Sequence, residues 1–368
     1  MDPIGEKKPD IARQGNEFRI FTDGDALYED MFAAIHTAQR TICLESYIFA
    51  NDRVGGRFIE LLCERARAGV SVRLHIDAFG SLPLMFSTAP ERLRTAGVAL
   101  QWFNPPRPLR LFRLNRRNHR KLLVVDERFA WLGGFNIHEE SSRRHHGDGH
   151  WRDTHVRMGG ELAGEAAEAF DRLWRGERKK PLPVPSAGDA FLVTNHNLRQ
   201  THRFRRLLKR SMRRARQSIW LATPYFMPDA GTQRAMARAA KRGIDVRLLV
   251  PFKTDRPVTQ WAARAAYARL LAAGVRIYEF QPRILHAKTA VVDGHWSTVG
   301  TANLDYRSFY VNFELNLIST RIDLARELAR NFRDDLAVSE QVTSERWRRR
   351  GLRVRITELV GWLARKYL

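Results

Sequence analysis

The chain lacks features that would each point to a particular class of protein. It has only two cysteines in 368 residues, Cys43 and Cys63, which excludes a disulfide framework and a multi-cysteine zinc site. Both lie in apolar segments, as buried free thiols do. No stretch reaches the ~18 uncharged apolar residues of a membrane-spanning helix, and the polar N-terminus shows no apolar core of a secretory signal. If the protein meets a membrane, we expect it to lie on the surface.

Acidic side chains are also in deficit. There are 40 Asp and Glu against 63 Lys and Arg, which gives a formal net charge of +23 at pH 7. Such an excess predicts an anionic partner, which could be nucleic acid, acidic lipid or a phosphorylated substrate. Apolar residues make up 44% and charged residues 28%, so the composition is globular rather than disordered. The length suits two domains or two fused halves.

The sequence repeats itself. Residues 58–77 match 232–251, and 92–103 match 269–280, each pair with an amphipathic helix, a glycine and a short strand. Tyr47 and Tyr225 also occupy equivalent points. Helices that alternate with strands predict an α/β fold with a largely parallel, doubly covered sheet in each half. A duplication of this kind makes a pseudo-two-fold axis the expected relation between the halves.

Composition then predicts four segments. The first half covers 18–175 and the second covers 190–340. Between them, residues 176–189 are rich in proline and charge, which is typical of a linker. Residues 341–368 form a basic tail with apolar residues at helical spacing.

Both halves carry the same polar motif, His-x-Lys-x4-Asp followed by a glycine and an asparagine. The residues are His119, Lys121, Asp126 and Asn136 in the first half and His286, Lys288, Asp293 and Asn303 in the second. A histidine and a lysine two residues apart on a strand point to the same face. Each half therefore presents one imidazole and one ammonium group together. Because the aspartates follow an apolar run at the end of a strand, their position favours a turn.

Two histidines and two lysines at one site can exchange a phosphodiester. The lysines and asparagines supply donors for the phosphate oxygens. One neutral imidazole attacks phosphorus, and the other, protonated, gives a proton to the leaving alkoxide. This scheme needs no metal and no cofactor, and it predicts a bell-shaped pH profile. A histidine nucleophile also needs an acceptor for its other ring nitrogen, for which we predict Asp153 and Glu314.

The paired motif resembles that of the phospholipase D superfamily over residues 18–335. Within it, the segments 44–55, 133–141 and 299–316 are similar to bacterial cardiolipin synthases. Because no N-terminal transmembrane hairpin is visible, the chain is most similar to the type that begins with a soluble segment. The resemblance implies two fused phospholipase D-like α-β-α lobes, related by a pseudo-two-fold axis, each with a mostly parallel mixed sheet. It also implies one active site at the interface of the lobes.

The resemblance further implies a role for each motif residue. His119 and His286 form the histidine pair, with His119 as the nucleophile, and Lys121 and Lys288 bind phosphate. Asp126 and Asp293 complete the catalytic motif. The residues expected to bind substrate are Asn136, Asn303, Arg120 and Thr301. The first half has Phe135 where many members have a small hydroxyl residue after the glycine, which Thr301 supplies in the second half.

Two basic segments indicate the substrate. Residues 105–121 contain seven basic residues and no acid, interleaved with leucine and phenylalanine, and 345–368 combine basic residues with an apolar face. Arginine with aromatic residues can bind a nucleic-acid strand, but aliphatic interleaving favours an anionic bilayer. A solvated loop and a helix packed on the second half are the alternatives. We therefore expect anionic phospholipid, above all phosphatidylglycerol, to be the partner, rather than nucleic acid.

The expected function is that of a cardiolipin synthase-like phosphatidyltransferase. A phosphatidyl group would move from phosphatidylglycerol, or phosphatidylethanolamine, to a phosphatidylglycerol hydroxyl through a phosphohistidine. The expected location is the cytoplasmic face of a bacterial inner membrane, as a peripheral protein. The alternatives are a phospholipase D-type hydrolase, a nuclease of the same superfamily, and an inactive binding scaffold.

Overall fold

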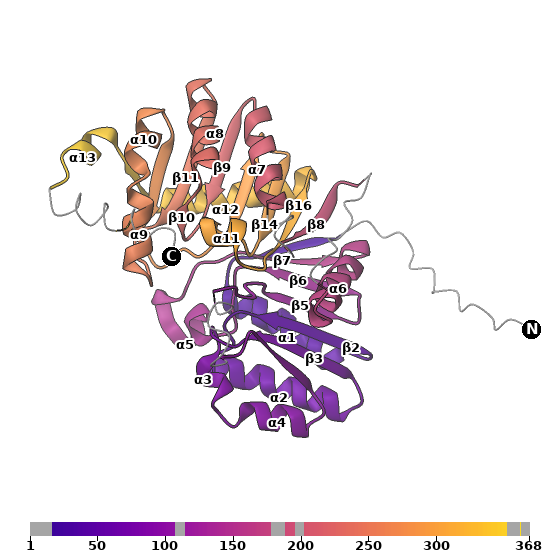
Figure 1. Cartoon of the computed structure of the whole chain (residues 1–368). Helices are drawn as coiled ribbons and strands as arrows, with labels where there is room; N and C mark the ends of the chain where they lie inside the picture. Colours follow the sequence, from indigo (N-terminus) through magenta and orange to yellow (C-terminus); the bar gives the residue numbers. More distant parts are fainter. Residues whose placement is uncertain (1–16, 107–114, 178–187, 196–201, 352–360, 362–368) are drawn as a thin grey trace, which may run out of the picture.

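The fold consists of two large sheets, one from each half of the chain, which meet in the middle of the molecule (Figure 1). A computed structural model describes residues 17–106, 115–177, 188–195, 202–351 and 361. The predicted linker and tail, and residues 107–114 of the first basic segment, therefore lie largely outside the described residues. No helix among the described residues is long and apolar enough to cross a membrane.

The first sheet has seven strands in the order β1-β7-β6-β5-β2-β3-β4. Their bounds are β1 Phe18–Phe21, β2 Thr41–Ser46, β3 Ser71–Asp77, β4 Ala99–Phe103, β5 Leu122–Val125, β6 Phe129–Gly133 and β7 His155–Gly159. The helices of this half are α1 Gly24–Thr37, α2 Arg53–Arg67, α3 Leu82–Met85, α4 Ala89–Thr95, α5 Arg143–His146 and α6 Glu161–Trp174. The N-cap Asp52 accepts the backbone N–H of Gly55 at 2.8 Å and so starts α2.

The second sheet has eight strands in the order β17-β12-β11-β9-β13-β14-β16-β8. Their bounds are β8 Ala190–Thr194, β9 Ser218–Ala222, β11 Asp245–Pro251, β12 Arg276–Phe280, β13 Thr289–Val292, β14 Trp296–Gly300, β16 Leu315–Ser319 and β17 Ser339–Val342. The short strands β10 Phe226–Met227 and β15 Leu304–Asp305 pair separately. The helices are α7 Arg203–Arg214, α8 Ala230–Lys241, α9 Pro257–Arg264, α10 Tyr267–Ala272, α11 Tyr306–Tyr310, α12 Ile322–Ala337 and α13 Ser344–Arg348.

The duplication read from the sequence is visible in the strand order. From β12 to β8 the second sheet repeats the first sheet from β4 to β1, and β17 is added at its edge. The helix ends also correspond: Gly69 and Gly243 have φ of +88° and +85°, the left-handed conformation that follows a helix and favours glycine. β17 pairs with β12, so the second sheet continues to Val342, past the predicted start of the tail at 341.

The sheets are mixed, as expected, but they are not mostly parallel. Among the described strands of the two large sheets, only β2–β3, β3–β4, β9–β11 and β11–β12 pair in parallel, and every other pair is antiparallel. The reason is the way the chain connects the strands. A helical crossover returns the chain in the same direction, whereas the motif strands β5 and β6, and likewise β13 and β14, form hairpins, which are antiparallel.

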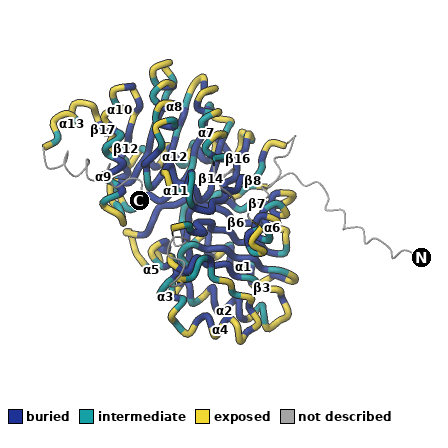
Figure 2. The backbone as a smooth tube through the Cα atoms, in the orientation of Figure 1, coloured by how far each residue is buried: buried dark blue, intermediate teal, exposed yellow. Residues whose placement is uncertain are grey.

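Helices cover both faces of each sheet, which gives the predicted α-β-α layers. In the first half, α1, α2 and α4 bury apolar side chains on one face, and α6 covers the other. In the second half, α7, α8 and α10 pack on one face, with α12 on the other. Strands of both sheets and the helices α6 and α12 share a single apolar cluster. The buried backbone therefore continues from one half into the other (Figure 2).

Candidate active site

A cavity of about 460 Å³ lies where the two halves meet, and both halves line it. Its walls include both motif histidines and both motif asparagines, together with the equivalent tyrosines: His119, Asn136, His286, Asn303, Tyr47 and Tyr225. The expected single site between the lobes thus has a physical counterpart, a pocket that neither half could form alone.

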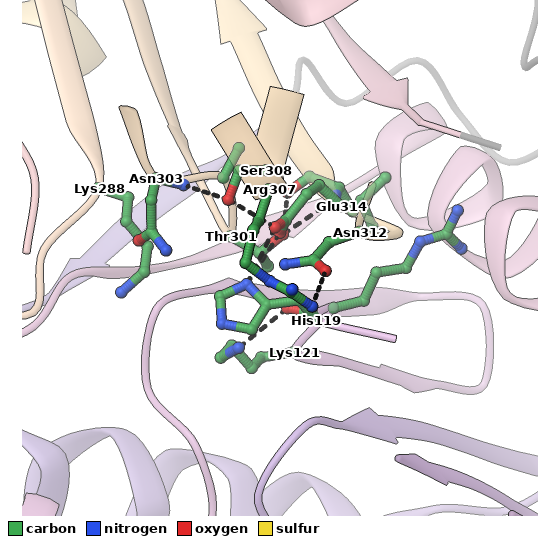
Figure 3. A network of polar contacts seen from close by, with 12 residues as sticks. His119, Lys121, Lys288, Thr301, Asn303, Arg307, Ser308, Asn312 and Glu314 are labelled. Carbon is green, nitrogen blue, oxygen red and sulfur yellow. Dashed lines mark hydrogen bonds and ion pairs between the residues drawn. The ribbon is translucent and has the colours of Figure 1, made fainter. Parts of the chain in front are cut away.

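His119 is held by the opposite half of the chain. Its backbone N–H donates to the carbonyl oxygen of Phe313 at 3.0 Å, and Phe313 N–H donates to the carbonyl of Arg117 at 2.9 Å. The next residue after Phe313 is Glu314, whose carboxylate oxygens lie 3.0 and 3.1 Å from Nδ1 of His119. Figure 3 shows Glu314 on one side of the imidazole and Lys121 on the other.

His286 repeats this arrangement in the reverse sense. Its N–H donates to the carbonyl of Arg152 at 2.7 Å, while Arg152 N–H donates to the carbonyl of Ile284 at 2.9 Å. The residue after Arg152 is Asp153, and its Oδ2 lies 2.5 Å from Nδ1 of His286. Each histidine therefore pairs with an acid from the other half. In both rings the acid engages Nδ1, which leaves Nε2 as the nitrogen available to a substrate.

The two carboxylates have different environments. Burial raises the pKa of Glu314 to about 7, although Lys121 and the hydroxyl groups of Thr301 and Ser308 oppose that rise. Burial acts in the same direction on Asp153, but the charge of Lys288, followed by the interaction with His286, outweighs it and lowers the pKa of Asp153. Asp153 therefore stays ionised at neutral pH, whereas Glu314 is partly protonated.

The motif lysines are nearly inaccessible, with 2% and 4% of their surfaces exposed. Burial, followed by repulsion from Lys288, lowers the pKa of Lys121 to about 7, and burial lowers the pKa of Lys288 too. Lys121 Nζ donates to the carbonyl of His119 at 2.9 Å, and Lys288 Nζ lies 3.6 Å from Oδ2 of Asp153. Two ammonium groups that repel each other beside two imidazoles favour an anion between them.

Without substrate, this environment favours the neutral form of both imidazoles. Burial and the charges of Lys121 and Lys288 hold the pKa of His119 well below its usual 6.5. Burial and Lys288 lower the pKa of His286 to about 4, against the opposing charge of Asp153. Because a bound phosphodiester adds a negative charge next to both rings, it raises both values.

Both motif asparagines, Asn136 and Asn303, line the cavity. Asn136 is fixed by its Oδ1, which accepts the N–H of Ile48 at 3.1 Å. Asn303 is fixed through its backbone, whose N–H donates to Oγ of Ser308 at 3.1 Å, and its buried Oδ1 accepts no hydrogen bond from the described residues.

Arg120 and Thr301 differ from the expectation that they bind substrate, since other groups of the protein already engage both side chains behind the cavity. Arg120 is fully buried, lies 3.7 Å from the carboxylate of Glu45 and donates to the carbonyl of Ala169 at 3.1 Å. The residue between His119 and Lys121 points to the opposite face of an extended segment. Thr301 donates its hydroxyl to Glu314 and so holds the acid behind His119.

The motif aspartates also lie away from the cavity. Asp126 and Asp293 have φ of +53° and +52°, a left-handed conformation that aspartate tolerates better than most residues. Asp126 accepts backbone N–H groups of residues 39–41, all at 2.8 Å, and Asp293 those of 216–218 at 2.8–2.9 Å. This placement differs from the expectation of a catalytic set and agrees with the turn that their strand-end position favours.

The structure adds residues that the motif search missed. The ring of Tyr47 lies 5.0 Å from that of His119, and Trp151 lies 5.1 Å from His286. Three arginines also line the cavity, namely Arg117, Arg256 and Arg307. The signal for Trp151 and Arg117 was spacing, since each lies two residues before a site residue. Nothing local distinguishes Arg256 and Arg307 from the many other arginines.

A family model described as "Cardiolipin synthase, PLD-like domain" matches residues 31–174 and 208–336. The chain belongs to this family. It is 37% identical to a cardiolipin synthase of Geobacillus kaustophilus, over 98% of this chain and 73% of that protein. It is 33% identical to a probable cardiolipin synthase of Bacillus subtilis, over 93% and 70%. These matches confirm the predicted family and an enzyme of the phosphatidyltransferase class.

Solved structures support the fold. A phosphatidylserine synthase of Haemophilus influenzae aligns with a TM-score of 0.72 and 13% identity, over 95% of this chain and 92% of that one. A polyphosphate kinase of Porphyromonas gingivalis aligns with a TM-score of 0.63 and 16% identity, over 90% and 49%. At these identities the likeness concerns the two-lobed architecture alone.

Proposed function

We propose that this protein makes cardiolipin by moving a phosphatidyl group, in two steps, from phosphatidylglycerol or phosphatidylethanolamine to a hydroxyl of phosphatidylglycerol. The observation that carries the proposal is the pair of crossed acid–histidine contacts at one cavity. They leave two Nε2 atoms available beside two buried ammonium groups, the arrangement that a double displacement at phosphorus requires.

In the first step, Nε2 of His119 attacks the phosphorus of the donor. The bond from phosphorus to the head-group oxygen breaks, and that oxygen takes a proton from Nε2 of His286, so the free head-group alcohol leaves. Lys121, Lys288, Asn136 and Asn303 hold the phosphoryl oxygens. The phosphatidyl group now sits on His119 and His286 is neutral.

In the second step, neutral His286 takes the proton of the acceptor hydroxyl as that oxygen attacks phosphorus. The bond from phosphorus to nitrogen breaks, which frees His119 and restores the proton to His286. Water at this point would give phosphatidic acid instead, so a transferase must exclude it. The hydrolase therefore differs only in the acceptor and is the second candidate.

The unequal carboxylates support the division of roles between the histidines. An ionised Asp153 at 2.5 Å stabilises the imidazolium form of His286, which a general acid needs. A Glu314 with a pKa of about 7 supports a positive charge on His119 less strongly, which suits a neutral nucleophile. We propose no chemical role for Asp126 and Asp293, and for Thr301 a role in holding Glu314.

The substrate places the protein at a membrane. We propose peripheral association with the cytoplasmic face of a bacterial inner membrane, through the basic segments 105–121 and 345–368. Positive charge interleaved with aliphatic residues supports binding to an anionic bilayer surface.

Product analysis tests the proposal. The purified protein is incubated, in EDTA, with vesicles that contain labelled phosphatidylglycerol, and the lipids are resolved by mass spectrometry. We expect cardiolipin and free glycerol, and neither from His119→Ala. Phosphatidic acid without cardiolipin would identify a hydrolase, and no turnover of lipid would reject the proposal.

A further inference from the structure

Arg117 is a buried cation, and the described residues supply its guanidinium with no hydrogen bond or ion pair. Only 8% of its surface is exposed, and its Nη1 is fully buried with no hydrogen-bond acceptor among the described residues. The guanidinium makes no ion pair there either. The guanidinium lies over the ring of Phe79, whose centroid is 4.3 Å from Cζ of Arg117. Burying a charge costs free energy unless it is paired, so a bound anion would stabilise this side chain.

The surroundings of Arg117 make the site cationic. Asp77 lies close enough for the charge of Arg117 to oppose the rise that burial causes in the pKa of Asp77, and its carboxylate also accepts backbone N–H groups of Asn118, Phe79 and Gly80 at 2.8–3.1 Å. Arg307 also lies close to Arg117, and burial together with the charge of Arg117 lowers the pKa of Arg307 against the opposing charge of Asp305. Arg307 is held by Asn115, with both contacts at 2.6 Å. Both arginines line the cavity that holds the histidines.

The position of Arg117 relative to His119 matches the length of the product. The two residues are two apart on an extended segment that pairs with Phe313, and so lie roughly 7 Å apart along the chain. Cardiolipin carries two phosphodiesters joined by one glycerol. When the first phosphorus is bonded to His119, the acceptor's own phosphodiester lies one glycerol length away and is also anionic.

We propose that Arg117, together with Arg307, binds the phosphodiester of the acceptor lipid. This inference rests on the proposed function and names the residues that select an anionic acceptor. Arginine binds a phosphodiester through two parallel N–H donors, and here the guanidinium is already desolvated and held against Phe79. The selectivity for a phospholipid hydroxyl over water and free alcohols then comes from the charge carried by the acceptor.

The test compares two reactions that share the donor step and differ in the charge of the acceptor. The first is cardiolipin formation in vesicles of phosphatidylglycerol and phosphatidylcholine. The second is exchange of labelled glycerol into phosphatidylglycerol, for which the acceptor is neutral. In Arg117→Gln we expect the ratio of cardiolipin formation to glycerol exchange to fall at least tenfold. Arg117→Lys keeps the charge but not the two-donor geometry, and we expect an intermediate ratio.

Arg94→Gln is the matched control, because it removes the same charge from an exposed side chain of α4 that lies outside both basic segments and does not line the cavity. Its ratio should equal that of the wild type. An unchanged ratio in Arg117→Gln, or an equal fall in both reactions, would overturn the proposal, and the equal fall would place Arg117 at the donor phosphate. Neither product from the wild type would instead reject the proposed function.

Thermal unfolding separates a binding role from a structural one. Since no hydrogen bond or ion pair from the described residues holds the buried charge of Arg117, Arg117→Gln should leave the Tm unchanged or raise it. A Tm several degrees below that of the wild type would show that the side chain supports the fold. The ratio in Arg117→Lys would then decide the role, because a wild-type ratio in that variant contradicts two-donor binding.

Discussion

The substitution Asp153→Asn should impair the proposed general acid, His286, without impairing the proposed nucleophile, His119. Asp153 lies 2.5 Å from Nδ1 of His286 and 3.6 Å from Nζ of Lys288, and an asparagine removes the charge at nearly constant shape. A hydrogen bond between charged groups contributes about 1.5–3 kcal/mol. At 1.36 kcal/mol for each tenfold change in rate, the loss corresponds to about 10- to 150-fold. The substitution therefore destabilises the imidazolium form of His286, which is the form proposed to protonate the leaving group.

The assay compares leaving groups that do and do not need a proton. Release of glycerol from phosphatidylglycerol requires a general acid, because an alkoxide leaves poorly, whereas nitrophenolate leaves unaided from a nitrophenyl phosphodiester. The first turnover is followed in each case, so that the second step does not contribute. We expect Asp153→Asn to slow glycerol release by about 10- to 150-fold and to slow nitrophenolate release by less than threefold.

Glu314→Gln is the matched comparison, since it alters the acid behind the proposed nucleophile. It should slow both first turnovers by the same factor, because attack by His119 precedes either departure. If Asp153→Asn slowed both substrates equally, His286 would not be the general acid. If Glu314→Gln alone showed the dependence on leaving group, the roles of the two histidines would be exchanged.

Three further predictions concern a glycine beside Asp153, a buried lysine and a turn aspartate. A Cβ on Gly134 would lie 2.0 Å from Oδ1 of Asp153, so Gly134→Ala should reproduce the loss of glycerol release seen in Asp153→Asn, measured in the same assay. The pKa of Lys121 is about 7, so kcat/KM should fall as the pH rises through about 7 and the ammonium loses its charge; Lys121→Arg should move this limb upward, and an unmoved limb would exclude Lys121. Asp293→Asn should lower stability in urea at pH 7 by about 1–2 kcal/mol and change kcat less than twofold. Because the folded pKa of Asp293 is lowered, that stability difference should shrink as the pH falls below about 4.

Much of the site could be predicted from the sequence because the motif is duplicated. Two copies of His-x-Lys at matching points specify two histidines and two lysines without any knowledge of the fold. The strand-end position of Asp126 and Asp293 likewise predicts the turns that they close, since a carboxylate at such a point accepts backbone N–H groups locally. These inferences concern neighbours in sequence, where spacing is informative.

Contacts between distant segments could not be predicted in the same way. Asp153 and Glu314 were identified as orienting acids, but the sequence does not indicate that each serves the histidine of the opposite half. The pairing depends on the bridges of Asn118 with Phe313 and of Arg152 with Leu285, which join segments more than 100 residues apart. The prediction of mostly parallel sheets was wrong for a related reason. Helices that alternate with strands indicate crossover connections, but they do not indicate the hairpins that follow.

Phe135 and Thr301 show how the halves diverged at one position. Thr301 donates to Glu314, but Phe135 has no hydroxyl to offer, and Asp153 instead accepts the N–H of Thr154 at 2.7 Å. Glu314 therefore accepts hydrogen bonds from side-chain hydroxyl groups, whereas Asp153 accepts one from the backbone and lies beside Lys288. The difference in charge state comes instead from the strong burial of Glu314 and from Lys288 beside Asp153, because the Thr301 hydroxyl lowers the pKa of Glu314.

The exchange of acids between the halves has a consequence for symmetry. Two identical chains, each with one motif, would assemble a site with two equal acid–histidine pairs, and any mutation would change both at once. Covalent joining of the copies removes that constraint, because a substitution beside Glu314 leaves Asp153 untouched. A ping-pong reaction asks one imidazole to hold a phosphoryl group while the other shuttles a proton. In this chain, substitutions can change the environment of each histidine separately, although each histidine pairs with an acid from the opposite half of the chain.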